Sequence, residues 1–352
     1  MKKHKIGIVG LGRGRAFVNV FGAHPDVEIT AICDIDENRL KEIGDLFKLP
    51  DNKRFTDYDD FINSDFDIVV ISTPIPYHTE QTIKALENKK DVLCEQTVAY
   101  TIEECEKVLN AVKKSKQIYM MAENYCYFHY IREWKKIVES GKLGEIYYAE
   151  GEYIHNIVNL LFDKDKYTWR AYRPPILYCA HTLGPLLMIM NDRIVKGCGL
   201  TSGFKKIPEC SNLIGFLDIE VGLFKTKKGA IIKILRSQVA ARPHMVWYCL
   251  YGTKGHLENQ RYKGDGLYYV EGEIESSYPC PISDPELEEK EQRGGHGTSE
   301  YYMIRDFLYA VENRTRPPID IIRAIDFTVP GIIAHQSAMK DGIWLDVPLF
   351  DW

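Results

Sequence analysis

Short apolar runs alternate with amphipathic stretches over the first third of the chain. The aliphatic, β-branched runs predict strands over residues 6–10, 27–33, 66–72, 92–94 and 118–122. Stretches with helical periodicity predict helices over residues 36–47, 77–87 and 101–114. Because such alternation is typical of a doubly wound parallel sheet, we expect an α/β domain over residues 1–124.

The pattern changes after about residue 124. A helix is predicted over residues 127–140, and strands with a period of two follow at 145–154, 217–224, 230–238 and 245–251. Turn sequences at 227–229 and 252–255 predict hairpins, and helices return at 299–312 and 319–338. The acidic, polar segment 271–298 is expected to be an exposed loop. Residues 125–352 should therefore form an α+β domain with a large, mostly antiparallel open sheet.

The composition fits a globular protein of two domains. The 352 residues are 45% hydrophobic with a formal charge of −5, whereas single cores usually stop growing near ~250–300 residues. The mildly acidic balance argues against nucleic acid as a partner. No apolar run reaches the ~20 residues of a membrane span, and the N-terminal run is too short for a signal peptide. Nine scattered cysteines without a CxxC motif predict reduced thiols in a cytoplasmic protein.

A glycine-rich turn directly follows the first predicted strand. Its candidate cofactor-binding residues are Gly10, Gly12, Arg13, Gly14 and Arg15. Glycines let a backbone turn tightly and approach a pyrophosphate, whose charge then lies at the N-terminus of the next helix. Asp34 ends the second strand, where a carboxylate accepts a ribose hydroxyl hydrogen bond and repels a 2′-phosphate. This order predicts NAD rather than NADP; the alternative is a glycine turn in an α/β fold that binds no nucleotide.

Two further loops follow strands at the same expected edge of the sheet. The first contains Ser72, Thr73, Pro74 and His78, and the second contains Glu95 and Gln96. Ligands in open α/β sheets bind beyond the carboxyl ends of the strands, so we expect both loops to contact the cofactor. The alternatives are a helix N-cap for the first loop and a solvated acid for Glu95.

Together these motifs resemble the Gfo/Idh/MocA oxidoreductase family. The resemblance extends over nearly the whole chain and includes Trp169, Arg170 and His181. It implies a Rossmann domain, an α+β domain that forms a dimer or tetramer through its open sheet, and hydride transfer between NAD and a sugar or cyclitol. It also implies that Asn124, Trp169 and Arg170 contribute to the cofactor site.

Two positions depart from the family pattern. The usual Glu-Lys-Pro carries a catalytic lysine, and Gln96 stands in its place, although an amide cannot transfer a proton. The usual Asp-x-Gly-x-His motif ends in His181, but its Asp position is Leu177.

A closer resemblance, to NAD-dependent glycosidases similar to α-N-acetylgalactosaminidases, accounts for both departures. It rests on the motifs at 123–127, 153–155, 178–185 and 294–301. It implies catalytic roles for Tyr127, Tyr178, His181 and Tyr301, and substrate contacts for His155 and Arg173. The implied reaction oxidises C3 of the sugar, eliminates the C1 substituent, adds water and returns the hydride. Histidine, with an unperturbed pKa of ~6.5, suits proton transfer at neutral pH, whereas tyrosine, near ~10, needs a nearby cation such as Arg170 or Arg173.

Each of these residues also has a structural interpretation. The chain contains 22 tyrosines, so any one of them is more often a packing residue than a base. His181 begins an apolar run and would equally suit the N-terminus of a helix. No HExxH motif or Cys/His cluster is present, so we expect no metal. Three functions remain open: an NAD-dependent sugar dehydrogenase, a redox-neutral NAD-dependent glycosidase, and a non-catalytic sensor of NAD or sugar.

Overall fold

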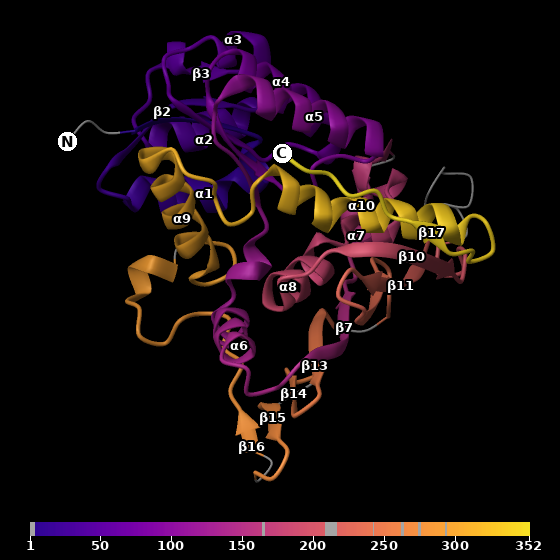
Figure 1. The fold of residues 1–352 in the computed structure, drawn as a ribbon. Helices are drawn as coiled ribbons and strands as arrows, with labels where there is room; N and C mark the ends of the chain where they lie inside the picture. Colours follow the sequence, from indigo (N-terminus) through magenta and orange to yellow (C-terminus); the bar gives the residue numbers. More distant parts are fainter. Residues whose placement is uncertain are drawn as a thin grey trace. The chain divides into compact units, whose positions relative to one another are not determined.

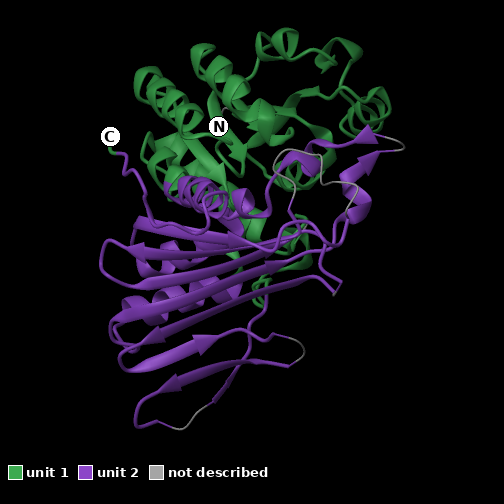
Figure 2. Cartoon of the chain, turned by 90° about the vertical axis from the view of Figure 1, so that its right-hand side faces the viewer, with its two compact units in different colours: residues 1–128, 282–325, 351–352 green, residues 129–281, 326–350 purple. Residues whose placement is uncertain are grey.

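The computed structural model describes residues 4–163, 166–207, 217–241, 243–261, 264–273, 276–292 and 294–352. The chain folds as two units, coloured separately in Figure 2. Unit 1 comprises residues 1–128, 282–325 and 351–352, and unit 2 comprises residues 129–281 and 326–350. The boundary expected at residue 124 thus lies close to the first crossing, but residues 282–325 return to the N-terminal unit.

Unit 1 is built on a six-stranded parallel sheet with strand order β3-β2-β1-β4-β5-β6. The strands are β1 (His4–Val9), β2 (Val27–Cys33), β3 (Arg54–Phe55), β4 (Ile68–Ile71), β5 (Asp91–Glu95) and β6 (Tyr119–Ala122). All four residues of β4 are buried, as expected for a strand covered by helices on both faces. The strand order reverses between β1 and β4, which is where open α/β sheets bind their ligands. This sheet confirms the predicted Rossmann-type fold.

The helices of unit 1 are α1 (Leu11–Ala23), α2 (Glu37–Leu46), α3 (Tyr58–Ile62), α4 (His78–Glu87), α5 (Ile102–Ser115) and α9 (Ser299–Asn313), with short 3₁₀ turns η1 (Asp51–Lys53), η2 (Ile75–Tyr77), η3 (Asn124–Tyr127) and η7 (Glu289–Gln292). Side chains cap the N-termini of α2, α3 and α5 among these helices. Asp36 caps α2, and Thr101 with Glu104 forms a capping box on α5. Helix α9 packs beside α1, which explains why this late segment belongs to the N-terminal unit (Figure 1).

Unit 2 is built on a nine-stranded sheet with strand order β16-β15-β14-β13-β7-β12-β11-β10-β17. The strands are β7 (Ile146–Ile154), β10 (Ile194–Thr201), β11 (Ile219–Thr226), β12 (Ile231–Ser237), β13 (Met245–Gly252), β14 (Gly255–Glu258), β15 (Gly266–Val270), β16 (Ser276–Tyr278) and β17 (Leu345–Asp346). Only the β7–β12 pair is parallel within this sheet, which confirms the mostly antiparallel open sheet (Figure 2). The turns at 227–229 and 252–255 form the predicted hairpins.

Helices cover one face of this sheet. They are α6 (His129–Glu139), α7 (Val158–Leu161), α8 (Ala180–Met190) and α10 (Ile321–Ala338), whose chain crosses from unit 1 into unit 2, with a ribbon of β8 (Phe162–Asp163) and β9 (Lys166–Tyr167) and the 3₁₀ turns η4 (Trp169–Tyr172) and η5 (Pro175–Tyr178). Helix α8 approaches β7 closely at Gly151, where an added Cβ would lie 3.0 Å from the carbonyl oxygen of Thr182. This close approach holds the first turn of α8 against the end of β7.

Most described residues of the segment 271–298 are exposed, as its composition predicts, but the segment also contains secondary structure. Its described residues include β16, η7 and the buried side chains of Cys280, Asp284 and Thr298. The Thr298 hydroxyl accepts a hydrogen bond from the backbone amide of Asp284, at 2.9 Å, which ties the middle of the segment to its C-terminal end. Composition predicted the exposure of the segment but not this buried contact.

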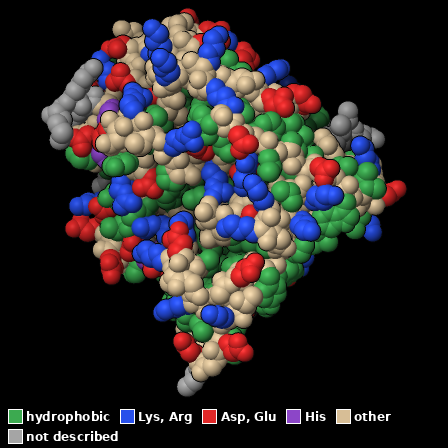
Figure 3. Space-filling model, viewed as in Figure 1, with side chains coloured by type: hydrophobic (Ala, Val, Ile, Leu, Met, Phe, Trp, Pro, Cys, Tyr) green, Lys and Arg blue, Asp and Glu red, His purple; other side chains and the backbone are tan. Residues whose placement is uncertain are grey.

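The distribution of charge on the described surface is relevant to the prediction that nucleic acid is not a partner. On the face shown in Figure 3, acidic and basic side chains are interspersed rather than gathered into a field of one sign. Among the described residues, no helix combines the length and apolarity needed to cross a bilayer. No disulfide joins the eight cysteines that the structure describes, and Cys210 lies outside the described residues.

Candidate functional site

The glycine-rich turn packs against the loop that follows β4. Gly10 has φ +84°, and a Cβ there would lie 2.6 Å from backbone atoms of Ser72 and Thr73. A Cβ on Gly14 would lie 2.8 Å from the Ser72 hydroxyl oxygen. That hydroxyl donates to the carbonyl oxygens of Val9 (2.9 Å) and Gly10 (3.1 Å). Ser72 therefore fixes the turn, and its predicted contact with the cofactor stays a prediction.

The space beside Gly12 is open in a way that fits a dinucleotide. The nearest atom to a Cβ built there is the Arg39 Nη1, at 3.6 Å. No acidic side chain lies in the first turn of α1, so the positive end of its helix dipole is not neutralised from within that turn. An open backbone approach at a helix N-terminus is what a pyrophosphate requires, so the residues present fit NAD.

Asp34 is a buried carboxylate fixed by two backbone amides. Its Oδ2 accepts from the amide of Leu11 at 2.7 Å, and its Oδ1 accepts from the amide of Asp36 at 2.9 Å. The Nη1 of Arg39 lies 3.6 Å from Oδ1. A carboxylate has about four acceptor positions. Asp34 therefore retains capacity for ribose hydroxyls while it also holds the first amide of α1.

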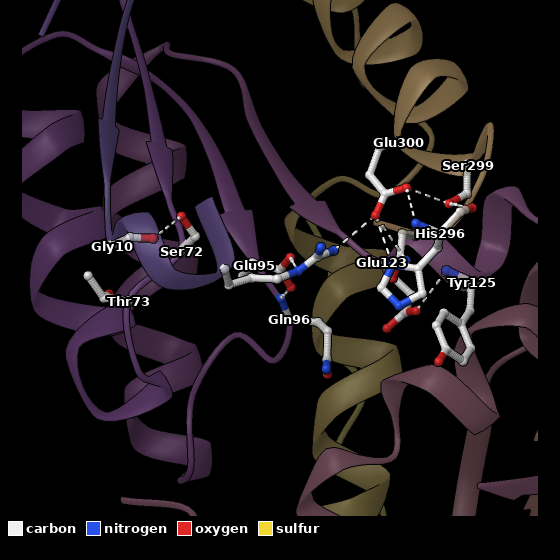
Figure 4. Close-up of polar contacts among 12 residues, drawn as sticks. Gly10, Ser72, Thr73, Glu95, Gln96, Glu123, Tyr125, His296, Ser299 and Glu300 are labelled. Carbon is white, nitrogen blue, oxygen red and sulfur yellow. Dashed lines mark hydrogen bonds and ion pairs between the residues drawn. The ribbon is translucent and has the colours of Figure 1, made fainter. Parts of the chain in front are cut away.

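Arg13 connects the glycine turn to two carboxylates. Its Nε donates to Glu95 at 2.7 Å, and its Nη2 donates to Glu300 at 3.2 Å (Figure 4). Glu95 is therefore an ion-pair partner of Arg13 rather than a solvated loop acid. Arg15 instead forms an exposed ion pair with Glu42, at 2.8 Å. The two arginines of the motif therefore have different partners.

Glu300 is a fully buried acceptor that sequence reasoning missed. Besides Arg13, it accepts from the backbone amide of His296 (3.1 Å) and the hydroxyl of Ser299 (2.9 Å), and the His296 Nδ1 lies 2.9 Å away (Figure 4). Burial alone would raise the pKa of Glu300, but the hydrogen bond and charge of His296 and the charge of Arg13 outweigh it and lower the pKa to about 2. A Cβ on Gly294 would lie 2.5 Å from Glu300, a constraint that only the structure reveals.

The loops after β4 and β5 are joined by His78. Its ring nitrogens lie 2.8 Å from the carbonyl oxygen of Thr97 and 2.9 Å from that of Thr73, and burial lowers the pKa of His78. Pro74 precedes η2 as its N-cap residue. Gln96 is buried beside Glu95, whose carboxylate accepts a hydrogen bond from the Gln96 backbone amide at 3.2 Å. His78 therefore positions both loops.

Three other predicted residues lie in unit 1. Asn124 and Tyr127 are both buried in η3, and the amide nitrogen of Asn124 donates to Glu300 at 3.5 Å. Burial, followed by the charge of Asp306, raises the pKa of Tyr127 well above its ordinary value, which does not favour it as a base. Tyr301 is half-buried on α9, with its ring 5.4 Å from that of Tyr302.

The other predicted residues lie in unit 2, where three rings form a cluster. The His181 ring, in the first turn of α8, stacks on Tyr153 at 5.4 Å between centroids and meets Tyr178 edge-on at 5.0 Å. Tyr178 is the last residue of η5, and Tyr153 is near the end of β7. The Tyr248 hydroxyl donates to the His181 carbonyl oxygen. These contacts bring together Tyr178 and His181 as the sequence motif requires.

A cavity of about 150 Å³ lies next to this cluster. It is lined by Tyr153, His155, Ile157, Leu160, Arg170, Arg173, Tyr178, Arg236, Ser237 and Gln238. The Arg173 guanidinium lies 4.0 Å from the centroid of Tyr178, and that of Arg170 lies 4.4 Å from the centroid of Trp169. Burial, followed at lower weight by the charges of Arg236 and Arg173, lowers the pKa of His155. His155, Arg170 and Arg173 therefore share one cavity with Tyr178.

Sequence reasoning missed Arg236, although the strand pattern contained a signal for it. The side chains of Ile232, Ile234 and Arg236 alternate with half-buried ones along β12 and are all buried. A cation in phase with the apolar positions of a strand lies on its covered face, which is costly unless the cation has a role. Within the described part of the chain, no group of three metal-ligating side chains is present.

Comparisons with known proteins agree with this geometry. Residues 4–123 match the model of the Gfo/Idh/MocA oxidoreductase family, NAD-binding Rossmann fold. A glycosyl hydrolase family 109 protein from Solibacter usitatus (strain Ellin6076) is 26% identical over 371 residues, which cover 95% of this chain and 85% of that protein.

Two solved structures share the fold over the whole chain. An oxidoreductase domain protein from Kribbella flavida has a TM-score of 0.84 at 20% identity and covers 99% of this chain and 100% of its own. A levoglucosan dehydrogenase solved with NADH and L-sorbose has a TM-score of 0.83 at 18% identity, with the same coverage. The predicted fold class, NAD cofactor and glycosidase-like resemblance are confirmed, and residues 4–123 belong to the NAD-binding Rossmann fold of the Gfo/Idh/MocA oxidoreductase family.

Proposed function

We propose that this protein cleaves a glycoside by redox-neutral, NAD-dependent chemistry that begins with oxidation of a hydroxyl-bearing sugar carbon. The observation that carries the proposal is the lining of the unit 2 cavity, which contains histidine, tyrosines and arginines but neither a carboxylate nor a lysine. Ordinary glycosidases use two carboxylates, and NAD-dependent glycosidases are an exception. The full-length similarity to a glycosyl hydrolase family 109 protein supports the same conclusion.

The residues divide into those that hold the cofactor and those that act on the sugar. The turn from Gly10 to Gly14 and Asp34 would hold NAD⁺, which supplies a hydride acceptor when bound. His181 takes the proton of the hydroxyl that is oxidised, because imidazole titrates near neutral pH. Tyr178 removes the proton from the carbon beside the new ketone, so that the C1 substituent can leave. Tyr301 is a further candidate for proton transfer to the leaving oxygen.

The cations of the cavity support this assignment. The Arg173 guanidinium, which lies over the Tyr178 ring, and Arg236, which lies 3.9 Å from the Tyr153 centroid, place positive charge beside the proposed reacting groups. Such fixed charges stabilise negative charge that develops on a sugar during proton removal. We infer a pyranoside substrate, which the levoglucosan dehydrogenase similarity also supports.

The test uses a panel of α- and β-nitrophenyl glycosides, including N-acetylhexosaminides, with the purified protein and NAD⁺. Nitrophenolate release is followed together with absorbance at 340 nm. The proposal expects many turnovers of nitrophenolate with no accumulation of NADH. Accumulation of NADH without nitrophenolate would instead identify a sugar dehydrogenase, and sugar binding without any turnover would identify a sensor.

We further infer that the protein assembles as a homo-oligomer through the open face of the unit 2 sheet. Strand register places Leu200, Val221, Leu223 and Leu235 on one face, and none of them is buried. Light scattering on the wild type should give a dimer or tetramer, and Leu223→Lys should reduce the mass because a charge would interrupt this apolar face. A wild type that runs as a monomer would contradict the inference.

A further inference from the structure

The unit 2 cavity contains two buried guanidinium groups that form no ion pair within the described part of the chain. Arg236 is 2% exposed and Arg173 is 3% exposed. Neither forms an ion pair with a carboxylate among the described residues, and none of the ten residues that line the cavity is acidic. Buried arginines are normally paired, so this arrangement requires an explanation.

Each guanidinium is anchored through one of its N–H groups and has another left over. The Arg236 Nε donates to the Pro175 carbonyl oxygen at 3.3 Å, whereas its Nη1 is buried without a hydrogen-bond partner. The Arg173 Nη2 donates to the Gln238 side chain at 3.2 Å, whereas its Nε is buried without a partner. Neutral acceptors therefore fix both side chains, and one buried donor on each remains for a ligand.

Aromatic rings stabilise these cations but do not neutralise them. Arg236 lies 3.9 Å from the Tyr153 centroid, and Arg173 lies 4.0 Å from the Tyr178 centroid. Such contacts stabilise a cation only modestly, whereas burial of an uncompensated ion is strongly unfavourable. Burial, followed by the nearby charge of Arg173, lowers the pKa of Arg236 to about 10, so Arg236 is still cationic at neutral pH.

We propose that Arg173 and Arg236 bind an oxyanion carried by the substrate, so that the glycoside is an acidic sugar bearing a carboxylate or a sulfate ester. Guanidinium groups match the geometry of such oxyanions, and an anion would satisfy both the charge and the two orphan donors. The inference rests on the proposed function, because it specifies which sugars that cavity accepts. It assigns Arg236, which no sequence motif identified, as a specificity residue.

Binding can be tested without turnover by calorimetry on the full chain with saturating NADH, which cannot accept a hydride from the ligand. The ligands are D-glucuronate and D-galacturonate, each compared with glucose and galactose, and glucose 6-sulfate as the ester arm. The expected result is that at least one acidic ligand binds 10-fold or more tightly than its neutral counterpart. A preference for the uronates identifies a carboxylate site, and a preference for the ester identifies a sulfate site. Equal binding of acidic and neutral ligands, or no binding of any acidic one, would overturn the inference.

Variants separate a specificity role from a structural one. Arg236→Gln and Arg173→Gln should each weaken the binding of the acidic ligand about 10- to 100-fold, because each variant loses one charge-assisted hydrogen bond. The neutral ligand should change less than about threefold. Lys196→Gln removes one positive charge from an exposed pair with Asp346 in the same unit and should leave both affinities unchanged. If the arginine variants reduce the affinities for acidic and neutral ligands alike, the arginines only maintain the shape of the cavity and the inference is wrong.

The two proposals fail in different ways. Redox-neutral cleavage of neutral nitrophenyl glycosides with no preference for acidic ones would overturn the acidic-sugar inference and leave the proposed function intact. Tight, arginine-dependent binding of a uronate with no cleavage of the matching nitrophenyl uronide would support the binding site and contradict the glycosidase.

Discussion

Replacement of Glu300 by glutamine should destabilise unit 1 far more than an ordinary Glu→Gln change. The side chain keeps its shape, but its charge disappears and one oxygen becomes an amide that faces donors. In the wild type, Arg13, the amide and ring of His296, the Ser299 hydroxyl and the Asn124 amide all point at this carboxylate. Glu300 is fully buried, so water cannot replace the lost interactions.

The size of the effect follows from these contacts. Breaking a buried ion pair by removing one partner costs about 3–5 kcal/mol. Lowering of the Glu300 pKa from 4.5 to about 2 corresponds independently to a contribution on the order of 3 kcal/mol at neutral pH. For a unit of this size, each kcal/mol shifts Tm by roughly 2–4 °C, so Glu300→Gln should lower Tm by roughly 6–20 °C.

The assay is thermal and urea unfolding at several pH values. Because the folded pKa of Glu300 is depressed, its contribution is present above about pH 4.5 and is lost as the pH falls toward 2. The difference in the free energy of unfolding between wild type and Glu300→Gln should therefore be largest at pH 7 and should decrease below pH 4.5. Glu288→Gln, which removes an exposed pair with Lys290, is the control and should change Tm by less than about 2 °C. A loss below about 1 kcal/mol for Glu300→Gln at pH 7 would refute this account.

Three further predictions concern the cofactor and the reaction. Gly10→Ala should lower both Tm and the affinity for NAD, because its Cβ would lie 2.6 Å from Ser72 backbone atoms. Gly12→Ala should weaken NAD binding about 10-fold but leave Tm nearly unchanged, because its Cβ would meet only open space and a flexible side chain. Equal losses of stability in the two variants would contradict this difference. In fluorescence titrations, Asp34→Ala should reduce the affinity for NAD more than the affinity for NADP. Equal reductions would mean that Asp34 does not contact the 2′-position. His181→Ala should abolish turnover and leave NAD affinity within about threefold, so a fully active variant would remove His181 from the mechanism.

The sequence predicted the parallel sheet of unit 1 well because its strands and helices are locally encoded. Strand 27–33 was predicted with the bounds that β2 has, and helix 101–114 differs from α5 by one residue at each end. The glycine turn and Asp34 were identifiable because the close packing of Gly10 and the buried amide contacts of Asp34 demand these residue types.

The features that were missed depend on contacts between distant parts of the chain. Glu300 lies 287 positions from Arg13, and nothing in the local pattern distinguishes it from a solvated acid at a helix start. Arg236 required both its strand face and the knowledge that no carboxylate lines the cavity beside it. Ser72 and His78 were correctly placed at the edge of the sheet, but only the structure shows that both bond to backbone carbonyl groups.

Isotope transfer during cleavage tests the central claim most directly. A nitrophenyl glycoside deuterated at C3 would be cleaved with NAD⁺ in ordinary water, and the same unlabelled glycoside would be cleaved in D₂O, with NMR analysis of the released sugar. The account predicts that deuterium at C3 is retained in the product and that solvent deuterium appears at C2, because the hydride returns to its own carbon whereas the C2 proton exchanges with solvent. Cleavage that proceeds without NAD⁺ and leaves C2 unlabelled would contradict it.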